Sequence, residues 1–496
     1  MFSFKKNIFL LILLILFGFI FFFRLDYKPL ESWDEAWYGS IANDVVKTGN
    51  FMDTTYNNKP YFDHPPAGFV LMAASYKLLG VSEFSTRLPS VLFGLMSILL
   101  IYLIASELFG RSEIAFASAL ILGSSVWYVI RVRSGNLDSA FLFFYLLTVY
   151  LSLKSARNFR WFPFVGLSFG ALIMTKTLAG ISVLVLIVLL NIKTLFGKRE
   201  NLIWLLLAFI FFYLLVFPWY KSHEAKYSDF LNYQIKHIGQ RDRTQLLLIP
   251  SNISQTLFYL HMGIRKWFKL WQLSFIPYLF LFLYQIYSYF KRGKKIKQKK
   301  SVEILPYLFI LIWTTVVLYP FLASSQTEIW HLIPVYPPIA LFIASVTFNI
   351  GLLFVKTVVT RFNLEKVNLV RIYPVIFIGA FLVLSFIQAK NFWAEVYPKV
   401  KYTNDEVDIS RRLSKYNQMI YVDGDYLPLA VFYSGKQIKS LILESDSVVT
   451  FTKLFEIDKG NVIGVTRNWV FDDLRKKNFN FKLLEKNNSY SIVTIP

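Results

Sequence analysis

The sequence contains no cysteine and little charge. Without cysteine there is no disulfide framework, no thiolate nucleophile and no cysteine-based metal site. Charged residues make up only 17% of the 496 residues, whereas average soluble proteins carry roughly 25%. Hydrophobic residues make up 55%, with 50 Phe. This composition argues against an ordinary soluble protein and indicates a membrane protein.

The positive charge is unevenly distributed. The formal net charge is +22, of which +19 falls in residues 1–389, in short loops between apolar segments. Clusters confined to such loops are typical of membrane topology rather than of a nucleic-acid interface. We therefore expect a bilayer, and no nucleic acid, as a partner.

Apolar segments predict a mostly α, polytopic bundle of about 11–13 helices. Eleven of them lie at residues 8–23, 88–108, 113–130, 137–153, 161–175, 177–196, 201–220, 271–290, 305–322, 333–354 and 370–388. We expect the first to be a span and not a signal peptide, because no small-residue cleavage site follows it.

Ala67–Leu79 is apolar but only 13 residues long, and the positive-inside rule decides its place. If it does not span, the basic clusters at 154–160, 193–199, 291–300 and 356–371 all lie in the cytoplasm. We therefore expect an interfacial or re-entrant helix within a long external first loop, residues 24–87. The N-terminus is then cytoplasmic.

Two domains are predicted, residues 1–389 in the membrane and a small soluble α/β domain at 390–496 on the external side. In the second, strands are expected at 419–425, 430–435, 461–466 and 489–495, and helices at 404–415 and 471–477. The external loop 221–269 is expected to lie along the membrane surface and cover a site.

Six stretches carry a family resemblance. They are DEAWYGSIANDVVKTGNF from Asp34, YFDHPPAG from Tyr61, FSTRLPSVLFG from Phe84, SGNLDS (134–139), MTKTLAG (174–180) and WHLIPVYPPIAL (330–341). Together they resemble the GT-C polytopic glycosyltransferases, in the branch of the lipid A aminoarabinose transferases and the protein O-mannosyltransferases. Two positions depart from the aminoarabinose transferases, which have Arg where this chain has Trp37, and Lys where it has His64.

The resemblance implies a GT-C fold and an enzyme of the bacterial cytoplasmic membrane. Such an enzyme moves a sugar from a polyprenyl-phosphate carrier to an acceptor on the external face, without an organic cofactor. The acceptor is a lipid A-type glycolipid or another envelope glycan, which is favoured, or a protein hydroxyl.

Sugar transfer from a phosphate needs a base, and cations that hold the departing phosphate. Asp34 is the candidate base, and Glu35 positions the acceptor or pins the loop. Asp138 is the third candidate catalytic residue. The alternative for Asp34 and Asp138 is a helix N-cap, a role that Asp fills well.

The other candidate residues fall into two groups. The candidate phosphate-binding residues are Lys59, Arg87, Arg131, Arg133, Lys176 and His331. The candidates for positioning the acceptor or the loop are Asp63, His64, Trp37, Tyr38 and Tyr61, with anchoring at the membrane interface as the alternative for the aromatic ones.

Asp63 and His64 are also candidate ligands of a divalent metal. That site requires a third ligand, for which His223, His237 and His261 are available, and the question stays open. Two other functions stay open as well. A lipid-linked-sugar flippase would carry charged residues inside its spans, and a non-catalytic assembly protein would tolerate Asp34→Asn.

Overall fold

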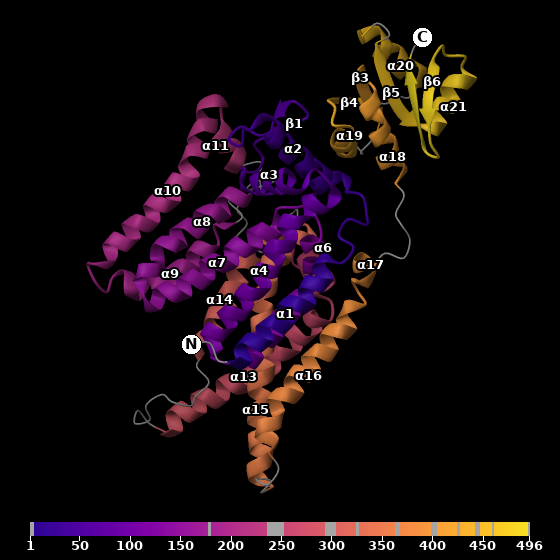
Figure 1. The fold of residues 1–496 in the computed structure, drawn as a ribbon. Coiled ribbons are helices and arrows are strands. Elements are labelled where there is room, and N and C mark those ends of the chain that lie inside the picture. The colour runs from indigo at the N-terminus through magenta and orange to yellow at the C-terminus, as the bar shows by residue number, and fades with distance from the viewer. Residues whose placement is uncertain are drawn as a thin grey trace. The chain divides into compact units, whose positions relative to one another are not determined.

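The computed structural model describes residues 4–176, 180–235, 252–292, 304–323, 327–362, 368–397, 404–423, 427–441, 447–458 and 461–494 (Figure 1). The chain divides into two compact units. Unit 1 is Met1–Phe23, Ser90–Arg133 and Leu137–Tyr397, and unit 2 is Arg24–Pro89, Ser134–Asn136 and Pro398–Pro496. The first loop therefore groups with the carboxyl-terminal residues, and the domain boundary predicted at 389/390 stays a prediction.

The described part of unit 1 consists of helices and their connections. They are α1 (Phe4–Phe22), most of α4 (Glu83–Phe109), α5 (Ser112–Gly123), α6 (Val126–Val132), α7 (Asp138–Arg157), η2 (Phe159–Trp161), α8 (Phe162–Lys176), α9 (Val183–Leu195), α10 (Asn201–Lys226), α11 (Phe230–Tyr233), α12 (Ile253–Ile264), α13 (Lys266–Arg292), α14 (Ile304–Leu322), η6 (Ile329–Val335), α15 (Tyr336–Arg361), α16 (Leu369–Ala389) and α17 (Trp393–Val396).

Several of these helices meet the length and apolarity that a bilayer requires. Among the described residues, α4, α7, α10, α14, η6 with α15, and α16 qualify, and the bent pair α5–α6 adds a seventh span if it counts as one. The mostly α, polytopic fold class is thus confirmed, with six or seven candidate spans. The predicted number of about 11–13 helices in the bundle stays a prediction.

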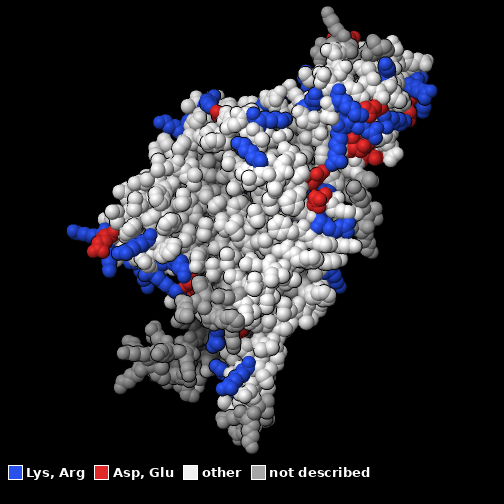
Figure 2. Space-filling view, in the orientation of Figure 1, with Lys and Arg blue, Asp and Glu red and all other residues white. Residues whose placement is uncertain are grey.

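The outer helices present apolar side chains where lipid would lie. Leu214 on α10 is 63% exposed and Phe386 on α16 is 82% exposed. In contrast, α15 packs against α5, α13, α14 and α16 and is buried over most of its first half. Figure 2 shows a broad uncharged surface over the helical part, whereas charged side chains crowd the carboxyl-terminal sheet domain.

The break between α5 and α6 determines where two arginines lie. The two helices meet at 70°. At the break the hydroxyls of Ser124 and Ser125 donate to the carbonyls of Leu120 and Ile121, four residues back, and such bonds bend helices. The short α6 that follows ends at Val132, between Arg131 and Arg133.

The first loop in unit 2 folds into a short π-helical turn, a helix, a hairpin and a second helix: η1 (Ser32–Ala36), α2 (Trp37–Thr48), β1 (Thr55–Tyr56), β2 (Lys59–Pro60) and α3 (Ala67–Leu79). Asn57 and Asn58 both have positive φ, 53° and 63°, which is the requirement of a two-residue type I′ hairpin. The range of α3 coincides with the predicted 67–79, and its interfacial location stays a prediction.

The carboxyl-terminal residues form a mixed five-stranded sheet with helices. The elements are α18 (Asp405–Arg412), η7 (Leu413–Lys415), β3 (Met419–Asp423), α19 (Leu427–Ser434), β4 (Ile438–Leu441), α20 (Ser447–Asp458), β5 (Val462–Arg467), α21 (Asn468–Lys476), β6 (Lys482–Lys486) and β7 (Tyr490–Thr494). The strand order is β4-β3-β5-β7-β6. β3 is parallel to β4 and β5, and β7 is antiparallel to β5 and β6.

The strand predicted at 430–435 is wrong, because these residues lie mainly in α19. β3 and β4 are parallel neighbours, so the chain between them must cross over, and a helix usually provides that connection. The predicted strands at 461–466 and 489–495 correspond to β5 and β7. Residues 424 and 425 of the first predicted strand lie outside the described residues.

Within unit 2, the sheet domain holds the first loop by three contacts. Leu30 N donates to Tyr433 Oη (2.8 Å), which donates in turn to Glu83 Oε1 (2.9 Å). The side-chain amide of Asn57, at the hairpin tip, exchanges two hydrogen bonds with the backbone of Ile438 (2.6 and 2.9 Å) on the edge strand β4. Gly39 packs closely under the Phe432 ring.

Candidate active site

Glu35 is buried and accepts four hydrogen bonds. It is 2% exposed, and its Oε1 accepts from Arg87 Nε (2.8 Å) and Gly135 N (2.7 Å). Its Oε2 accepts from Arg87 Nη2 (2.8 Å) and Glu31 N (2.9 Å). Burial by itself raises the pKa of Glu35, but Arg87 and the two N–H groups together outweigh it, so the pKa lies below its usual value.

Arg87 completes this arrangement. Besides the two bonds to Glu35, its Nη1 donates to the carbonyls of Leu25 and Lys28, and Nη2 to that of Pro29. All the N–H groups of the Arg87 guanidinium therefore donate to residues of the first loop. This geometry does not fit the prediction that Arg87 binds phosphate, and it favours the pinning role over the acceptor-positioning role for Glu35.

Asp34 lies immediately before this anchor in a strained backbone conformation. Its φ is 65° and its ψ −70°, the rare dihedrals of a γ-turn with positive φ. Helix α2 begins only at Trp37, and its N-cap is Ala36, two residues after Asp34. The N-cap alternative for Asp34 therefore does not hold. Strain of this kind concentrates at functional sites.

The predicted positioning residues cluster around α2 and the hairpin. Tyr38 is 8% and Tyr61 7% exposed, and both rings pack edge-on against Phe69. They thus serve the core of the loop. His64 lies edge-on to Tyr38 at 6.0 Å, and Trp37 contacts Tyr56 and Tyr61.

In unit 1, the Asp138 carboxylate accepts hydrogen bonds from two positively charged side chains. It is the first residue of α7 and 5% exposed. Its Oδ2 accepts from Arg131 Nε (2.7 Å) and its Oδ1 from Lys176 Nζ (2.5 Å). Leu137 is the N-cap of α7, so the N-cap alternative for Asp138 does not hold either. Together Arg131, Lys176 and Asp138 carry one net positive charge.

Two residues of the η6 turn interact with this group. Arg131 lies over the Trp330 ring at 5.2 Å, and His331 interacts electrostatically with Asp138. His331 also accepts from Glu328 N in a capping box. We call Arg131, Asp138, Lys176 and His331 the cation cluster. The sequence named all four residues, but not that a carboxylate binds two of the cations.

Two other predicted phosphate ligands lie elsewhere. Arg133 Nη1 donates to the carbonyls of Ile20, Phe21 and Phe23, at the carboxyl end of α1 (2.7, 3.0 and 2.9 Å). A cation there is favourable because the carbonyls carry partial negative charge, and this use explains Arg133 without a phosphate. Lys59 is exposed on β2 of the hairpin.

Sequence reasoning missed two residues beside α12. Arg265 separates α12 from α13 with a φ of 50°, and Tyr336 is 1% exposed. Within the described residues Arg265 Nε and Tyr336 Oη are buried without a hydrogen-bond partner, and Tyr336 Oη packs directly on Gly263. Such atoms mark places where a ligand or water completes the bonding. No sequence pattern signals a positive φ at Arg.

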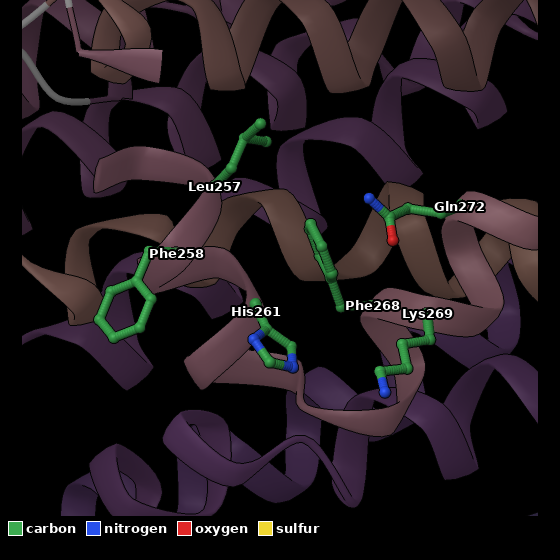
Figure 3. A pocket seen from close by; sticks show the side chains of 6 residues that line it. All are labelled: Leu257, Phe258, His261, Phe268, Lys269 and Gln272. Atoms are coloured by element: carbon green, nitrogen blue, oxygen red, sulfur yellow. The ribbon is translucent and has the colours of Figure 1, made fainter. Parts of the chain in front are cut away.

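A surface pocket of about 310 Å³ lies at the same helix pair (Figure 3). Its lining residues are Leu257, Phe258, His261, Phe268, Lys269 and Gln272. Figure 3 shows the Phe268 ring between the backbones of α12 and α13, with His261 and Lys269 extending to one side. An apolar floor with a cation at its edge suits an amphipathic lipid.

No metal centre emerges from the described part of the chain, where no group of three His, Asp or Glu side chains is arranged to hold an ion. His223, one of the three possible third ligands, is 1% exposed and its Nδ1 bonds to the Trp219 carbonyl. His237 lies outside the described residues. Metal dependence therefore stays a prediction.

The fold and these clusters define the class of protein: it is an integral membrane protein with several spans and a mixed-sheet domain. Residues 63–220 match the family described as dolichyl-phosphate-mannose-protein mannosyltransferase, which confirms the resemblance drawn from the sequence motifs. The fold is that of ArnT from Cupriavidus metallidurans, whose crystal structure bound to undecaprenyl phosphate superimposes with a TM-score of 0.67 at 17% identity, covering 98% of this chain and 97% of that one.

Two curated relatives are undecaprenyl phosphate-alpha-4-amino-4-deoxy-L-arabinose arabinosyl transferases. The protein from Pectobacterium atrosepticum is 25% identical over 67% of this chain and 58% of its own length. The protein from Pseudomonas savastanoi pv. phaseolicola is 30% identical over 31% of this chain and 30% of its own length. The chain thus spans less than two thirds of the length of the curated relatives it matches.

Proposed function

We propose that this chain is an integral-membrane glycosyltransferase that moves a sugar from a polyprenyl-phosphate carrier to an acceptor of the cell envelope. The observation that carries the proposal is Asp138 holding Arg131 and Lys176 together at the start of a candidate span. A largely buried group with net positive charge suits a phosphate. The match to ArnT, solved with undecaprenyl phosphate bound, supports a carrier of the same kind.

In this proposal the acceptor hydroxyl attacks the anomeric carbon of the donor sugar. The bond between that carbon and the phosphate oxygen breaks, the electron pair leaves with the phosphate, and the hydroxyl proton passes to Asp34. Arg131 and Lys176 stabilise the charge that develops on the phosphate. Asp138 keeps both cations in place, and the Glu35–Arg87 pair fixes the turn that carries Asp34.

The polar residues beside α12 fit the carrier. Arg265 Nε and Tyr336 Oη offer two buried donors to a phosphate, and the apolar pocket on α12 and α13 offers a surface to the isoprenoid chain. The sheet domain holds the first loop through Tyr433 and Asn57, which gives that domain a supporting role in the site.

The proposed topology follows the positive-inside rule. The N-terminus and the basic clusters at 154–160 and 193–199 are cytoplasmic, and the first loop and the sheet domain are external. The enzyme lies in the cytoplasmic membrane of a bacterium, and its acceptor is a lipid A-type glycolipid or another envelope glycan. A protein hydroxyl is the second candidate.

A transfer assay tests the proposal. Purified protein in lipid nanodiscs receives polyprenyl-phosphate sugars labelled in the sugar, with envelope lipid or envelope protein as acceptor. We expect label on the lipid fraction with wild type and with Asp26→Asn, an exposed acidic residue of the same loop, but not with Asp34→Asn. Label that crosses the bilayer on its carrier would instead identify a flippase. Equal transfer by Asp34→Asn would remove Asp34 as the base.

A further inference from the structure

Four aromatic side chains of the first loop form a connected group, which we call the aromatic cluster: Trp33, Trp37, Tyr56 and Tyr61. The Trp37 ring is in contact with the other three, at centroid distances of 5.5 Å to Trp33, 5.5 Å to Tyr56 and 5.8 Å to Tyr61. Trp33, which immediately precedes Asp34, is 56% exposed. The cluster therefore extends from the core of the loop to the surface beside the proposed base.

Two hydrogen-bond donors of this cluster are buried. Trp37 and Tyr56 are each partly exposed, yet Trp37 Nε1 and Tyr56 Oη are buried and have no partner within the described residues. Buried donors of this kind are rare, since their desolvation is not compensated. Two of them on touching rings indicate a place where a ligand supplies oxygen acceptors.

We infer that the aromatic cluster is the binding site for the saccharide part of the acceptor. Aromatic rings pack against the apolar C–H face of a sugar. Hydroxyl oxygens of the same sugar then accept hydrogen bonds from Trp37 Nε1–H and Tyr56 Oη–H. This inference rests on the proposed function. It assigns the acceptor rather than the donor because Trp33 adjoins Asp34, which takes the acceptor's proton.

Membrane anchoring and peptide binding fit the aromatic cluster less well. Aromatic residues that anchor a protein at the membrane interface keep their polar ends in the headgroup layer, whereas Trp37 Nε1 and Tyr56 Oη are buried. A Ser or Thr peptide brings a hydroxyl but no rigid C–H face for Trp33. A saccharide supplies both.

The test measures how two substrates respond to the same substitutions. Trp37→Phe and Tyr56→Phe each keep a ring and remove one donor, and Trp33→Ala removes the exposed ring. With lipid A as acceptor we expect KM for lipid A to rise about fivefold for each lost donor, the factor of one neutral hydrogen bond. KM for the polyprenyl-phosphate sugar should not change. Trp469→Ala, an equally exposed Trp of α21 (59%), is the control and should change neither.

Three outcomes would overturn the inference: an unchanged KM for lipid A, an equal rise in KM for the donor, or a rise confined to a Ser/Thr peptide acceptor. Binding of a soluble glucosamine disaccharide, followed by Trp fluorescence, separates this failure from failure of the proposed function. If wild type transfers no sugar but binds the disaccharide, and Trp37→Phe binds it at least fivefold more weakly, the site stands and the transferase does not. If neither protein binds it, the site is refuted.

Discussion

Glu35 and Arg87 lie 52 residues apart in the sequence and meet in a buried two-point ion pair, Nε–Oε1 and Nη2–Oε2 both at 2.8 Å. The carboxylate also ties Glu31 and Gly135, and the guanidinium ties the carbonyls at 25, 28 and 29. One pair thus joins three separate segments of unit 2. The turn that carries Asp34 directly precedes this junction.

Replacing Arg87 should destabilise the loop strongly. Arg87→Ala leaves the Glu35 carboxylate buried without its cation, which typically costs about 3–5 kcal/mol. Arg87→Lys cannot reproduce the two-point geometry. Thermal unfolding in detergent measures the effect, and Arg412→Ala is the control, since it breaks ion pairs with Asp408 and Glu485 near the surface, each worth about 0–1 kcal/mol. An Arg87→Lys protein as stable as wild type would contradict this role.

The pH dependence of the protein's stability should reflect the titration of Glu35. Its pKa in the folded protein is below the usual 4.5, so its contribution is fully present above that value and is lost as the pH falls through the folded pKa. We expect wild type to lose more stability on acidification than Glu35→Gln. Unfolding temperatures of the two proteins from neutral pH downward test this. Parallel curves would contradict it.

The cation cluster predicts a selective loss of donor binding. Arg131→Ala or Lys176→Ala removes a charge-assisted bond worth about 1.5–3 kcal/mol, so the affinity for the polyprenyl-phosphate sugar should fall about 10- to 100-fold. Arg157→Ala, at the other end of α7 with a side chain 66% exposed, should leave the affinity unchanged. Binding is measured by displacement of labelled polyprenyl phosphate. Equal losses of affinity in all three variants would mean that positive charge attracts the donor nonspecifically.

The sheet domain should hold the first loop in place. Tyr433→Phe leaves Leu30 N–H and Glu83 without their shared partner, and Asn57→Ala removes both bonds to β4. Each should raise hydrogen exchange in residues 25–60, because a buried polar group left unsatisfied costs about 1–3 kcal/mol. Tyr416→Phe loses a bond to Glu485 inside the sheet domain and serves as the control. Unchanged exchange in both test variants would refute the supporting role.

The sequence predicted the helical elements well and the polar contacts poorly. Ala67–Leu79 is a helix over the predicted residues, because Pro66 and Gly80 bound an apolar run. Residues 430–435 have the composition of a strand but form a crossover helix, since β3 and β4 became parallel neighbours. That outcome depends on strand order, which no local pattern encodes.

The arginines also show that polar contacts between distant residues could not be predicted from the sequence. Arg87, Arg131 and Arg133 look alike in sequence, each near the end of an apolar segment. Their roles differ because their partners come from distant residues: Glu35 for the first, Asp138 for the second and the carboxyl end of α1 for the third. Motif spacing therefore named the candidate residues but could not tell which of the arginines have a structural role and which are available for chemistry.

A single-turnover measurement with donor labelled in both sugar and phosphate tests whether the sugar leaves its carrier by transfer to an acceptor, with Asp34 as the base. We predict one free polyprenyl phosphate for each sugar found on the acceptor with wild type, and neither product with Asp34→Asn, which still binds donor. Equal product formation by Asp34→Asn, or sugar recovered only on its carrier, would contradict the account.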